Sequence, residues 1–297
     1  MKHRKDSLII EIAGGLGNQL FMFYAGLFFK EKLRKEIIFD ISDLKRIAKL
    51  HPGENIQTLG LLDEFATTTR PIKQLKILSR AFSRLEGISV RLPIKSTFVP
   101  QEIGFVNSDL VPSNVVRIRG YFQSWRYFDS LNEKPILSTS NLQNPSDWLI
   151  KNLAISKNER ILSFHVRRGD YALPSNRMNG ILSRKYYENV LSQVKDYDRL
   201  WVFTDAPKEL EFELSNRGFP FEIVSPPAYS AQVESLLLMS SSKHIAISNS
   251  TFSWWSAKLA GADTSIFAPS KWYELRDDPI DLIPDSWNRA TSDWMEQ

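Results

Sequence analysis

Short apolar runs alternate with longer segments of helical length, and this rhythm is clearest after residue 160. The apolar runs predict strands at 161–166, 200–204, 221–224, 244–248 and 264–268. The segments between them predict helices at 184–195, 207–216, 232–241 and 253–262. Strands that are joined through helices pair in parallel, so the second half is expected to form a doubly wound α/β sheet.

The first half opens with the same pattern. An apolar run at 7–13 predicts a strand, a glycine-rich loop follows at 14–19, and 20–35 and 37–40 predict a helix and a second strand. Further along, 115–121 predicts a strand and 123–130 an aromatic helix or turn, whereas 41–104 supports no detailed prediction. The polar stretch 141–148, which contains Pro145, is the candidate linker. We therefore expect an N-terminal domain of residues 1–145 and a C-terminal domain of residues 146–297.

Composition supports a globular protein of two domains. The chain has 297 residues, enough for two cores of about 150 residues each, and is 42% hydrophobic and 24% charged. There is no cysteine, which excludes thiolate nucleophiles and cysteine-bound zinc and permits a reducing compartment. The uncharged window 12–29 contains three glycines, Asn18 and Gln19 near its start, so it predicts a strand, a loop and a buried helix rather than a membrane span.

Charge is unevenly distributed although the net charge is only +4, which does not indicate a nucleic-acid partner. Residues 71–95 hold six basic side chains against the single acid Glu86. A solvated helix face explains this segment, and contact with an anionic membrane surface or a lipid-linked acceptor is the alternative.

The glycine loop Gly14-Gly15-Leu16-Gly17-Asn18-Gln19 lies between a predicted strand and a predicted helix. Backbone N–H groups there can approach a polar or anionic ligand closely. The loop is not a dinucleotide fingerprint, because Leu20 replaces the third glycine, and no lysine followed by serine or threonine makes it a P-loop. A tight turn that needs glycine for packing explains the pattern equally well.

Residues 165–171 read His-Val-Arg-Arg-Gly-Asp-Tyr and follow the strand 161–166. Two guanidinium groups at the carboxyl end of a parallel strand suit a pyrophosphate, so Arg167 and Arg168 are candidate phosphate ligands. Asp170 can neutralise and orient one of them. A purely structural ion pair between Arg168 and Asp170 is the alternative.

Two further loops follow predicted strands. Ser250, Thr251 and Ser253 precede or open a helix, where hydroxyls either cap the helix or bind phosphate at its N-terminus. Asp205 ends the strand 200–204, where a carboxylate either holds a ribose hydroxyl or guanine edge or caps the helix from Pro207.

Two acidic features could suggest a metal site, but neither is well placed for one. Asp196-Tyr197-Asp198 has the Asp-x-Asp spacing of metal-dependent sugar-nucleotide enzymes, but it precedes a strand and so lies at the wrong edge of the sheet. The acidic stretch 274–285 is better explained as a solvated loop.

The ordered set of motifs resembles the family 11 glycosyltransferases, the α-1,2-fucosyltransferases. The matching segments are Gly14 to Phe21, Gly120 to Ser124 with Tyr127-Phe128, His165 to Tyr171, Phe203-Thr204-Asp205, Leu238 to Ser240 with Lys243-His244, and Asn249 to Trp255. Each motif is modest alone, whereas their order along nearly the whole chain is highly specific.

The resemblance implies a GT-B fold, with an acceptor-side and a GDP-sugar-binding Rossmann-like domain facing a central cleft. It implies transfer of fucose from GDP-β-L-fucose with inversion and with no metal or other cofactor. The acceptor would be a terminal β-galactoside on an oligosaccharide or lipid-linked glycan. Carried over residue by residue, the phosphate ligands are Arg167 and Arg168, assisted by Ser250, Thr251 and Ser253.

The resemblance also implies that His165 and Asp205 contact guanosine. Asn18 would face the fucose, with Gly15, Gly17 and Gln19 on the donor. The general base is not assigned: Asp170, Glu11, Asp40, Asp43 and Glu54 are all candidates.

Three other functions stay open at this point. They are transfer of another GDP-sugar or to a different hydroxyl, a non-catalytic binding protein of the same fold, and an NAD-dependent oxidoreductase. The arginine pair and the missing third glycine count against the last of these. With no membrane anchor in the sequence, we expect a bacterial enzyme of the cytoplasm that contacts the inner membrane at most through residues 71–95.

Overall fold

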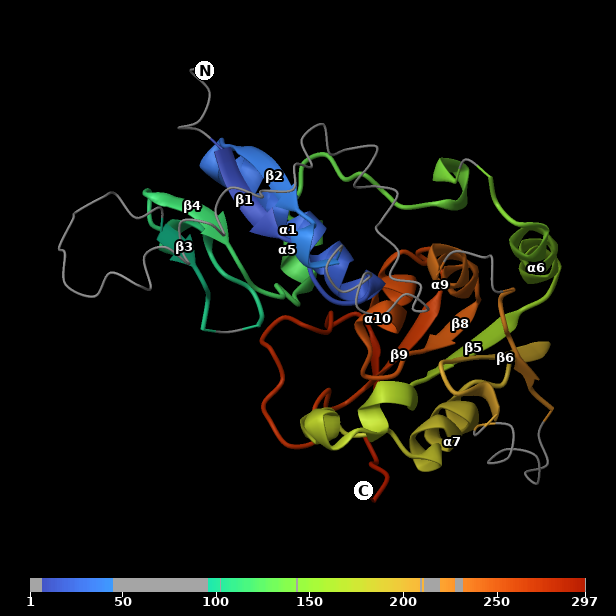
Figure 1. Cartoon of the computed structure of the whole chain (residues 1–297). Helices are drawn as coiled ribbons and strands as arrows, with labels where there is room; N and C mark the ends of the chain where they lie inside the picture. The colour runs from blue at the N-terminus through green and yellow to red at the C-terminus, as the bar shows by residue number, and fades with distance from the viewer. Residues whose placement is uncertain are drawn as a thin grey trace. The chain divides into compact units, whose positions relative to one another are not determined.

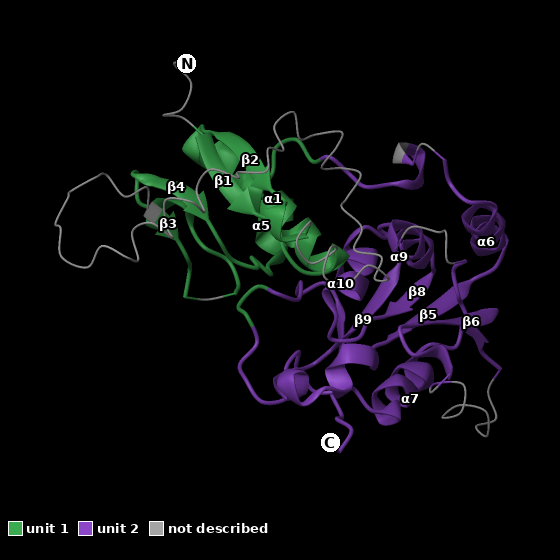
Figure 2. Ribbon diagram, in the orientation of Figure 1, with its two compact units in different colours: residues 1–134, 279–281 green, residues 135–278, 282–297 purple. Residues whose placement is uncertain are grey.

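The structure is a computed structural model that describes residues 7–44, 96–101, 103–142, 144–208, 210, 220–227 and 232–296. The chain divides into two compact units (Figure 2). The first comprises residues 1–134 and 279–281, and the second comprises residues 135–278 and 282–297. The basic segment 71–95 and Glu54 lie outside the described residues, so the expectations attached to them stay predictions.

The first unit contains a four-stranded sheet in the order β2-β1-β4-β3. Its strands are β1 (Ser7–Glu11), β2 (Glu36–Asp40), β3 (Ser96–Phe98) and β4 (Val115–Ile118). All of its strand pairs are parallel, and β1 runs in register with β2 from Ser7 opposite Glu36 to Glu11 opposite Asp40. The carboxyl ends of β1 and β2 therefore meet at one edge of the sheet.

The long helix α1 (Leu16–Leu33) forms the core of the first unit together with the short helix α5 (Trp125–Asp129). Apolar residues occur all around α1 and most of its side chains are buried, as expected for a helix inside a core. Within this core, the rings of Tyr24 and Phe128 pack edge to face with centroids 4.8 Å apart.

Helix α1 begins at Leu16, four residues before the predicted start at Leu20. Gly15 is its N-cap, and Gly17 is buried in its first turn. Of the three glycines only Gly17 lies inside the helix, where packing of the first turn overrides its low helix propensity.

The second unit contains a six-stranded sheet in the order β10-β9-β8-β5-β6-β7 (Figure 1). Its strands are β5 (Ile161–Val166), β6 (Arg199–Thr204), β7 (Glu222–Ile223), β8 (His244–Ala246), β9 (Ser265–Pro269) and β10 (Asn288–Ala290). Every pairing is parallel. Since all six residues of β5 are buried, this strand is the centre of the unit.

Helices cover both faces of this second sheet. The helices are α6 (Asp147–Asn158), α7 (Arg184–Gln193), α9 (Gln232–Ser240) and α10 (Thr251–Lys258). The chain moves from β5 through α7 to β6 in one direction and from β7 through α9 to β8 in the other, so right-handed crossovers place α7 and α9 on opposite faces. Figure 1 shows this arrangement, with α9 and α10 on one side of the sheet and α7 on the other.

The predicted α/β fold with parallel sheets is confirmed in both units. Strand β5 has the predicted bounds, and α7, β6, α9, β8, α10 and β9 begin or end within a few residues of the predicted positions. Helix α6 starts inside the stretch expected to be a linker, because Ser146 Oγ caps it by accepting a hydrogen bond from the backbone N–H of Leu149 at 3.2 Å. Of the helix predicted at 207–216, residues 207, 208 and 210 are described and are helical. Among the described helices, none combines the length and apolar character that crossing a bilayer requires.

Candidate active site

Three loops meet at the carboxyl edge of the second sheet, where they follow the adjacent strands β8, β5 and β6. Ligands of doubly wound sheets bind at such an edge. These loops and the strand ends beside them hold eight of the candidate residues: His165, Arg167, Arg168, Asp170, Asp205, Ser250, Thr251 and Ser253. The fold thus assembles at one edge residues that are separated by up to nearly ninety positions in the sequence.

His165 is buried near the end of β5. Its Nδ1 lies 2.7 Å from Ser248 Oγ, and its ring stacks on Phe252 with centroids 5.4 Å apart. Burial and, to a smaller extent, the charge of Arg167 lower the pKa of His165 to about 3. The imidazole is therefore neutral at pH 7, which fits a positioning or hydrogen-bonding role rather than a phosphate ligand.

Arg167 lies between two carboxylates. Its Nη2 pairs with Asp170 Oδ1, and its Nη1 lies 2.9 Å from Asp205 Oδ2. Its Cζ is also 5.4 Å from the centroid of the Tyr171 ring. The side chain is 29% exposed, so its guanidinium is both held in place and accessible to a ligand.

Asp205 joins the end of β6 to the end of β5. Its Oδ1 accepts a hydrogen bond from the backbone N–H of Arg168 at 2.9 Å, while Oδ2 pairs with Arg167. A Cβ atom on Gly169 would lie 2.2 Å from Asp205 Oδ2, so this close approach requires glycine at position 169. Asp205 thus organises residues 167–171, here called the arginine loop. Its contact with guanosine stays a prediction.

Arg168 points into the protein. It is 8% exposed, and its Nη1 donates to the backbone carbonyls of Arg167 at 3.2 Å and Leu182 at 3.1 Å. These bonds join the end of β5 to the segment before α7. The sequence pattern did not predict this inward orientation of Arg168.

The N-terminus of α10 supplies hydroxyl groups and backbone donors to the same edge. Ser250 is the N-cap residue, yet its side chain makes no capping hydrogen bond, and Thr251 is half-buried. Ser253 Oγ instead donates to the backbone carbonyls of Ser248 and Ser250, at 3.3 and 3.1 Å. Ser250 and Thr251 are therefore better placed than Ser253 to serve an anion at this helix terminus.

Three aromatic and cationic residues of this edge, Tyr171, Tyr273 and Arg276, received no role from the sequence. Tyr171 donates a 3.0 Å hydrogen bond to the carbonyl of Asn249, which joins the arginine loop to the loop before α10. The guanidinium of Arg276 lies over the ring of Tyr273, with Cζ 3.5 Å from the centroid. Burial raises the pKa of Tyr171, against the opposing charges of Arg167 and Arg276. A stacking pattern of this kind gives no signal in the sequence.

The glycine loop lies at the carboxyl end of β1 in the first unit. Gly14 has a φ of +74°, which favours glycine, and a Cβ on Gly15 would meet no atom within 4 Å. Gln19 is buried and donates from Nε2 to the carbonyl of Gly14 at 3.0 Å. Asn18 Oδ1 accepts a 3.1 Å hydrogen bond from Gln123 Nε2, which connects two of the motifs. The loop is therefore open beside Gly15, whereas the side chain of Gln19 is buried and held by a hydrogen bond.

Charged residues of the first unit also meet at the carboxyl edge of its sheet. Arg117 Nη1 lies 2.5 Å from Glu11 Oε1 and 2.9 Å from Asp40 Oδ2, and Arg119 pairs with Glu11. Burial alone would raise the pKa of Asp40, but hydrogen bonds from Ser42 and Arg117 lower it. Two of the candidate bases, Glu11 and Asp40, are thus engaged with arginine.

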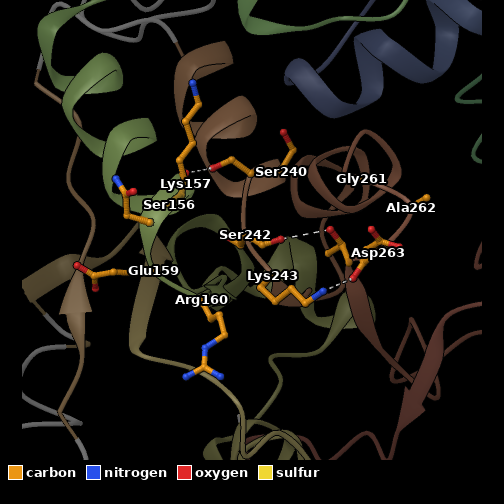
Figure 3. A pocket seen from close by; sticks show the side chains of 13 residues that line it. Ser156, Lys157, Glu159, Arg160, Ser240, Ser242, Lys243, Gly261, Ala262 and Asp263 are labelled. Atoms are coloured by element: carbon orange, nitrogen blue, oxygen red, sulfur yellow. Dashed lines mark hydrogen bonds between the residues drawn. The ribbon is translucent and has the colours of Figure 1, made fainter.

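A polar pocket of about 490 Å³ lies at the opposite, amino edge of the second sheet (Figure 3). Two of its charged side chains are engaged by nearby groups: Lys243 Nζ donates to the carbonyl of Asp263 at 3.0 Å, and Arg160 Nη2 pairs with Asp198 at 2.7 Å. Asp196 also pairs with Arg160, so both acids of the Asp-x-Asp motif belong to this edge. The C-termini of α6 and α9 end beside the pocket and disfavour anions.

In the described part of the chain, no group of three or more histidine, aspartate or glutamate side chains has a metal-binding arrangement. Asp278, from the acidic stretch, instead accepts hydrogen bonds from the backbone N–H groups of Trp272 and Tyr273.

Guanidinium groups, hydroxyls and a helix N-terminus at the edge of a Rossmann-like sheet are typical of enzymes that handle phosphorylated ligands. The model of the glycosyl transferase family 11 matches residues 7–279, and the chain therefore belongs to that family. The family predicted from the ordered motifs is confirmed, and so is the prediction that the chain is a glycosyltransferase.

Three curated relatives are each 26% identical to the chain. An alpha-1,2-colitosyltransferase of Escherichia coli aligns over 95% of this chain and 98% of its own length. The O-antigen biosynthesis glycosyltransferase WbnK of Escherichia coli aligns over 93% and 98%. The galactoside alpha-(1,2)-fucosyltransferase 2 of Sus scrofa aligns over 57% of this chain and 52% of its own length.

Proposed function

We propose that the protein transfers L-fucose from GDP-β-L-fucose to the 2-hydroxyl of a terminal β-galactoside, with inversion and without a metal ion. The observation that carries the proposal is the combination of Arg167, Arg168 and the hydroxyl-bearing start of α10 at one sheet edge. Two of the relatives are named for α-1,2 transfer, and one of them for a galactoside acceptor.

The leaving group sets the main electrostatic requirement of this reaction. The acceptor oxygen forms a bond to the anomeric carbon while the bond from that carbon to the β-phosphate oxygen breaks, and GDP departs with both bonding electrons. Negative charge therefore builds on the β-phosphate, and donors that are already oriented stabilise it. In this proposal Arg167 and the N-terminus of α10 face the diphosphate, and Arg168 acts at the same strand end, where it also holds the loop together.

Asp170 and Asp205 keep the guanidinium of Arg167 in one orientation. A side chain held between two carboxylates loses little conformational freedom when it binds a ligand, which improves discrimination of the transition state. Asp170 therefore acts as a positioning residue in this proposal.

The acceptor hydroxyl must lose its proton as the new bond forms. Asp40 is a weak candidate for the base, because Ser42 and Arg117 lower the pKa of its carboxyl group. His165 is neutral but buried against Ser248 and Phe252. We propose that the proton passes to solvent once the leaving group has largely departed.

Colitose is the most specific alternative donor, because one relative is named as a colitosyltransferase. Colitose is fucose that lacks the 3-hydroxyl, so an enzyme that hydrogen-bonds this hydroxyl discriminates strongly against GDP-colitose. The relative named for O-antigen biosynthesis favours a lipid-linked oligosaccharide over a free disaccharide as the natural acceptor.

The test is incubation of the purified protein with GDP-fucose, lactose and EDTA, with GDP release and the mass and linkage of the product as readouts. The proposal expects a product fucosylated at O2 of galactose, and GDP-colitose in a parallel reaction is expected to be a poorer donor. Fucosylation at another position would overturn the linkage, and activity that requires added divalent metal would overturn the metal independence. Faster turnover of GDP-colitose would replace fucose by colitose as the donor sugar.

A further inference from the structure

Arg276 occupies the loop that follows β9 and lies at the same edge as the arginine loop of β5. The backbone N–H of Leu275 donates to the carbonyl of Met178 at 3.4 Å, which fixes this loop against the segment that follows Tyr171. The guanidinium of Arg276 stacks on Tyr273, so the aromatic ring orients it without neutralising its charge.

The charge environment of Arg276 differs from that of Arg167. Arg167 pairs with both Asp170 and Asp205. No carboxylate within the described part of the chain forms an ion pair with Arg276. The Nε of Arg276 is also buried and has no hydrogen-bond partner among the described residues. A partly buried guanidinium with no carboxylate partner is costly unless an anion completes it.

Tyr171 places the two arginines near one another. Arg167 Cζ lies 5.4 Å from the centroid of the Tyr171 ring, and the Tyr171 hydroxyl donates to Asn249, immediately before the N-cap of α10. The charge of Arg276 acts on the same phenol. Arg167, the loop before α10 and Arg276 are thus all linked to Tyr171 at this sheet edge.

We propose that Arg276 binds the diphosphate of the sugar-nucleotide donor and supplies the positive charge that Arg167 has already shared with two carboxylates. This inference rests on the proposed function. Arg276 is then a binding residue for the donor, with Tyr273 as the positioning residue that holds its plane.

The test measures binding of GDP and of guanosine to the full-length protein by calorimetry, for the wild type and for Arg276→Gln. Losing one charge-assisted contact to the diphosphate is expected to weaken GDP binding about tenfold or more, and to leave guanosine binding within twofold of the wild type. The matched control is Arg199→Gln, which removes the same charge from the amino end of β6, where Arg199 pairs with Glu159. Its GDP affinity is expected to equal that of the wild type.

Two results would overturn the inference while the proposed function stands: GDP affinity of Arg276→Gln within twofold of a wild type that transfers fucose, or equal losses for GDP and guanosine. A wild type that binds no GDP would overturn the proposed function as well. If Arg276→Gln fails to fold by thermal denaturation, Arg276→Lys keeps the charge but loses the planar fork. For that variant we expect a several-fold loss for GDP alone, and unchanged GDP affinity would refute the inference.

Discussion

The carboxyl edges of the two sheets both carry arginines, but they use them differently. In the first unit, Arg117 and Arg119 each pair with a carboxylate that extends from the end of a strand. In the second unit, Arg167 is shared between two carboxylates, whereas Arg276 has no carboxylate partner among the described residues. The second edge also receives the N-terminus of α10.

Because of this difference in charge, we expect the two edges to bind different ligands, the first a neutral one and the second an anion. A balanced set of carboxylates and guanidiniums offers many hydrogen bonds and little net charge, which suits sugar hydroxyls. An edge with uncompensated guanidinium and a helix N-terminus suits a diphosphate. We therefore expect donor binding to depend on the second unit, and the following substitutions test that expectation in order of decreasing effect.

The largest effect is expected for Arg168→Ala. This variant removes a charge at the end of β5 and the hydrogen bonds to the carbonyls of Arg167 and Leu182. Because Arg168 holds the loop that carries Arg167, we expect kcat for fucose transfer to fall about 10²-fold or more, a loss as large as that from removing one charge-stabilising donor. Full activity of a folded Arg168→Ala protein would contradict this positioning role.

A smaller effect, and one on stability rather than donor binding, is expected for Arg117→Ala. Without Arg117, the nearly buried carboxylate of Asp40 and that of Glu11 lose an ion-pair partner. We expect the free energy of unfolding to fall by about 2 kcal/mol, discounted from the cost of breaking a fully buried pair. GDP affinity should stay within twofold of the wild type, and a tenfold loss would place the donor at the first unit instead.

The same glycine-to-alanine change should have a large consequence at Gly169 in the second unit and a small one at Gly15 in the first. At Gly169 the added methyl group meets Asp205 Oδ2, so the arginine loop must shift and transfer activity should fall about tenfold. At Gly15 the methyl group meets open space, and stability should change by less than about 1 kcal/mol. Steady-state kinetics and thermal denaturation of both variants check this pair, and equal effects would refute the geometric argument.

The last effect is absent at neutral pH and appears only as the pH falls. Burial depresses the pKa of His165 from its ordinary 6.5 to about 3, so within this window the unfolded chain binds a proton that the folded chain does not. The contribution of His165 to stability is therefore complete above pH 6.5 and is lost as the pH falls toward 3. Chemical denaturation at several pH values should show a shallower pH dependence for His165→Gln than for the wild type, by up to about 1.4 kcal/mol per pH unit. Parallel curves would contradict the burial of a neutral imidazole.

Apolar periodicity predicted the fold well where local pattern and tertiary packing agree. The run 161–166 is apolar because β5 is covered on both faces, and the structure gives it the predicted bounds. The pattern failed at Ser146, where a single cap starts α6 in a stretch whose polarity and proline favour a linker.

The candidate residues at the carboxyl edge of the second sheet were predictable as a set because parallel strands bring their carboxyl ends together. Their mutual contacts were not, since they depend on three-dimensional packing. The need for glycine at position 169 comes from Asp205, which lies in another loop. Arg276 was missed because it lies in an acidic stretch that resembles a solvated loop, and only the fold brings it toward Tyr171.

The central claim is that the donor binds at the carboxyl edge of the second sheet. Its most direct test is hydrogen exchange of the backbone amides, measured with and without saturating GDP. We predict slower exchange in segments 166–171 and 249–254 of the second unit, with no change at the strand ends 37–41 and 116–120 of the first. Protection confined to the first unit, or no protection in 166–171 when GDP is bound, would contradict the assignment of the donor to the second sheet edge.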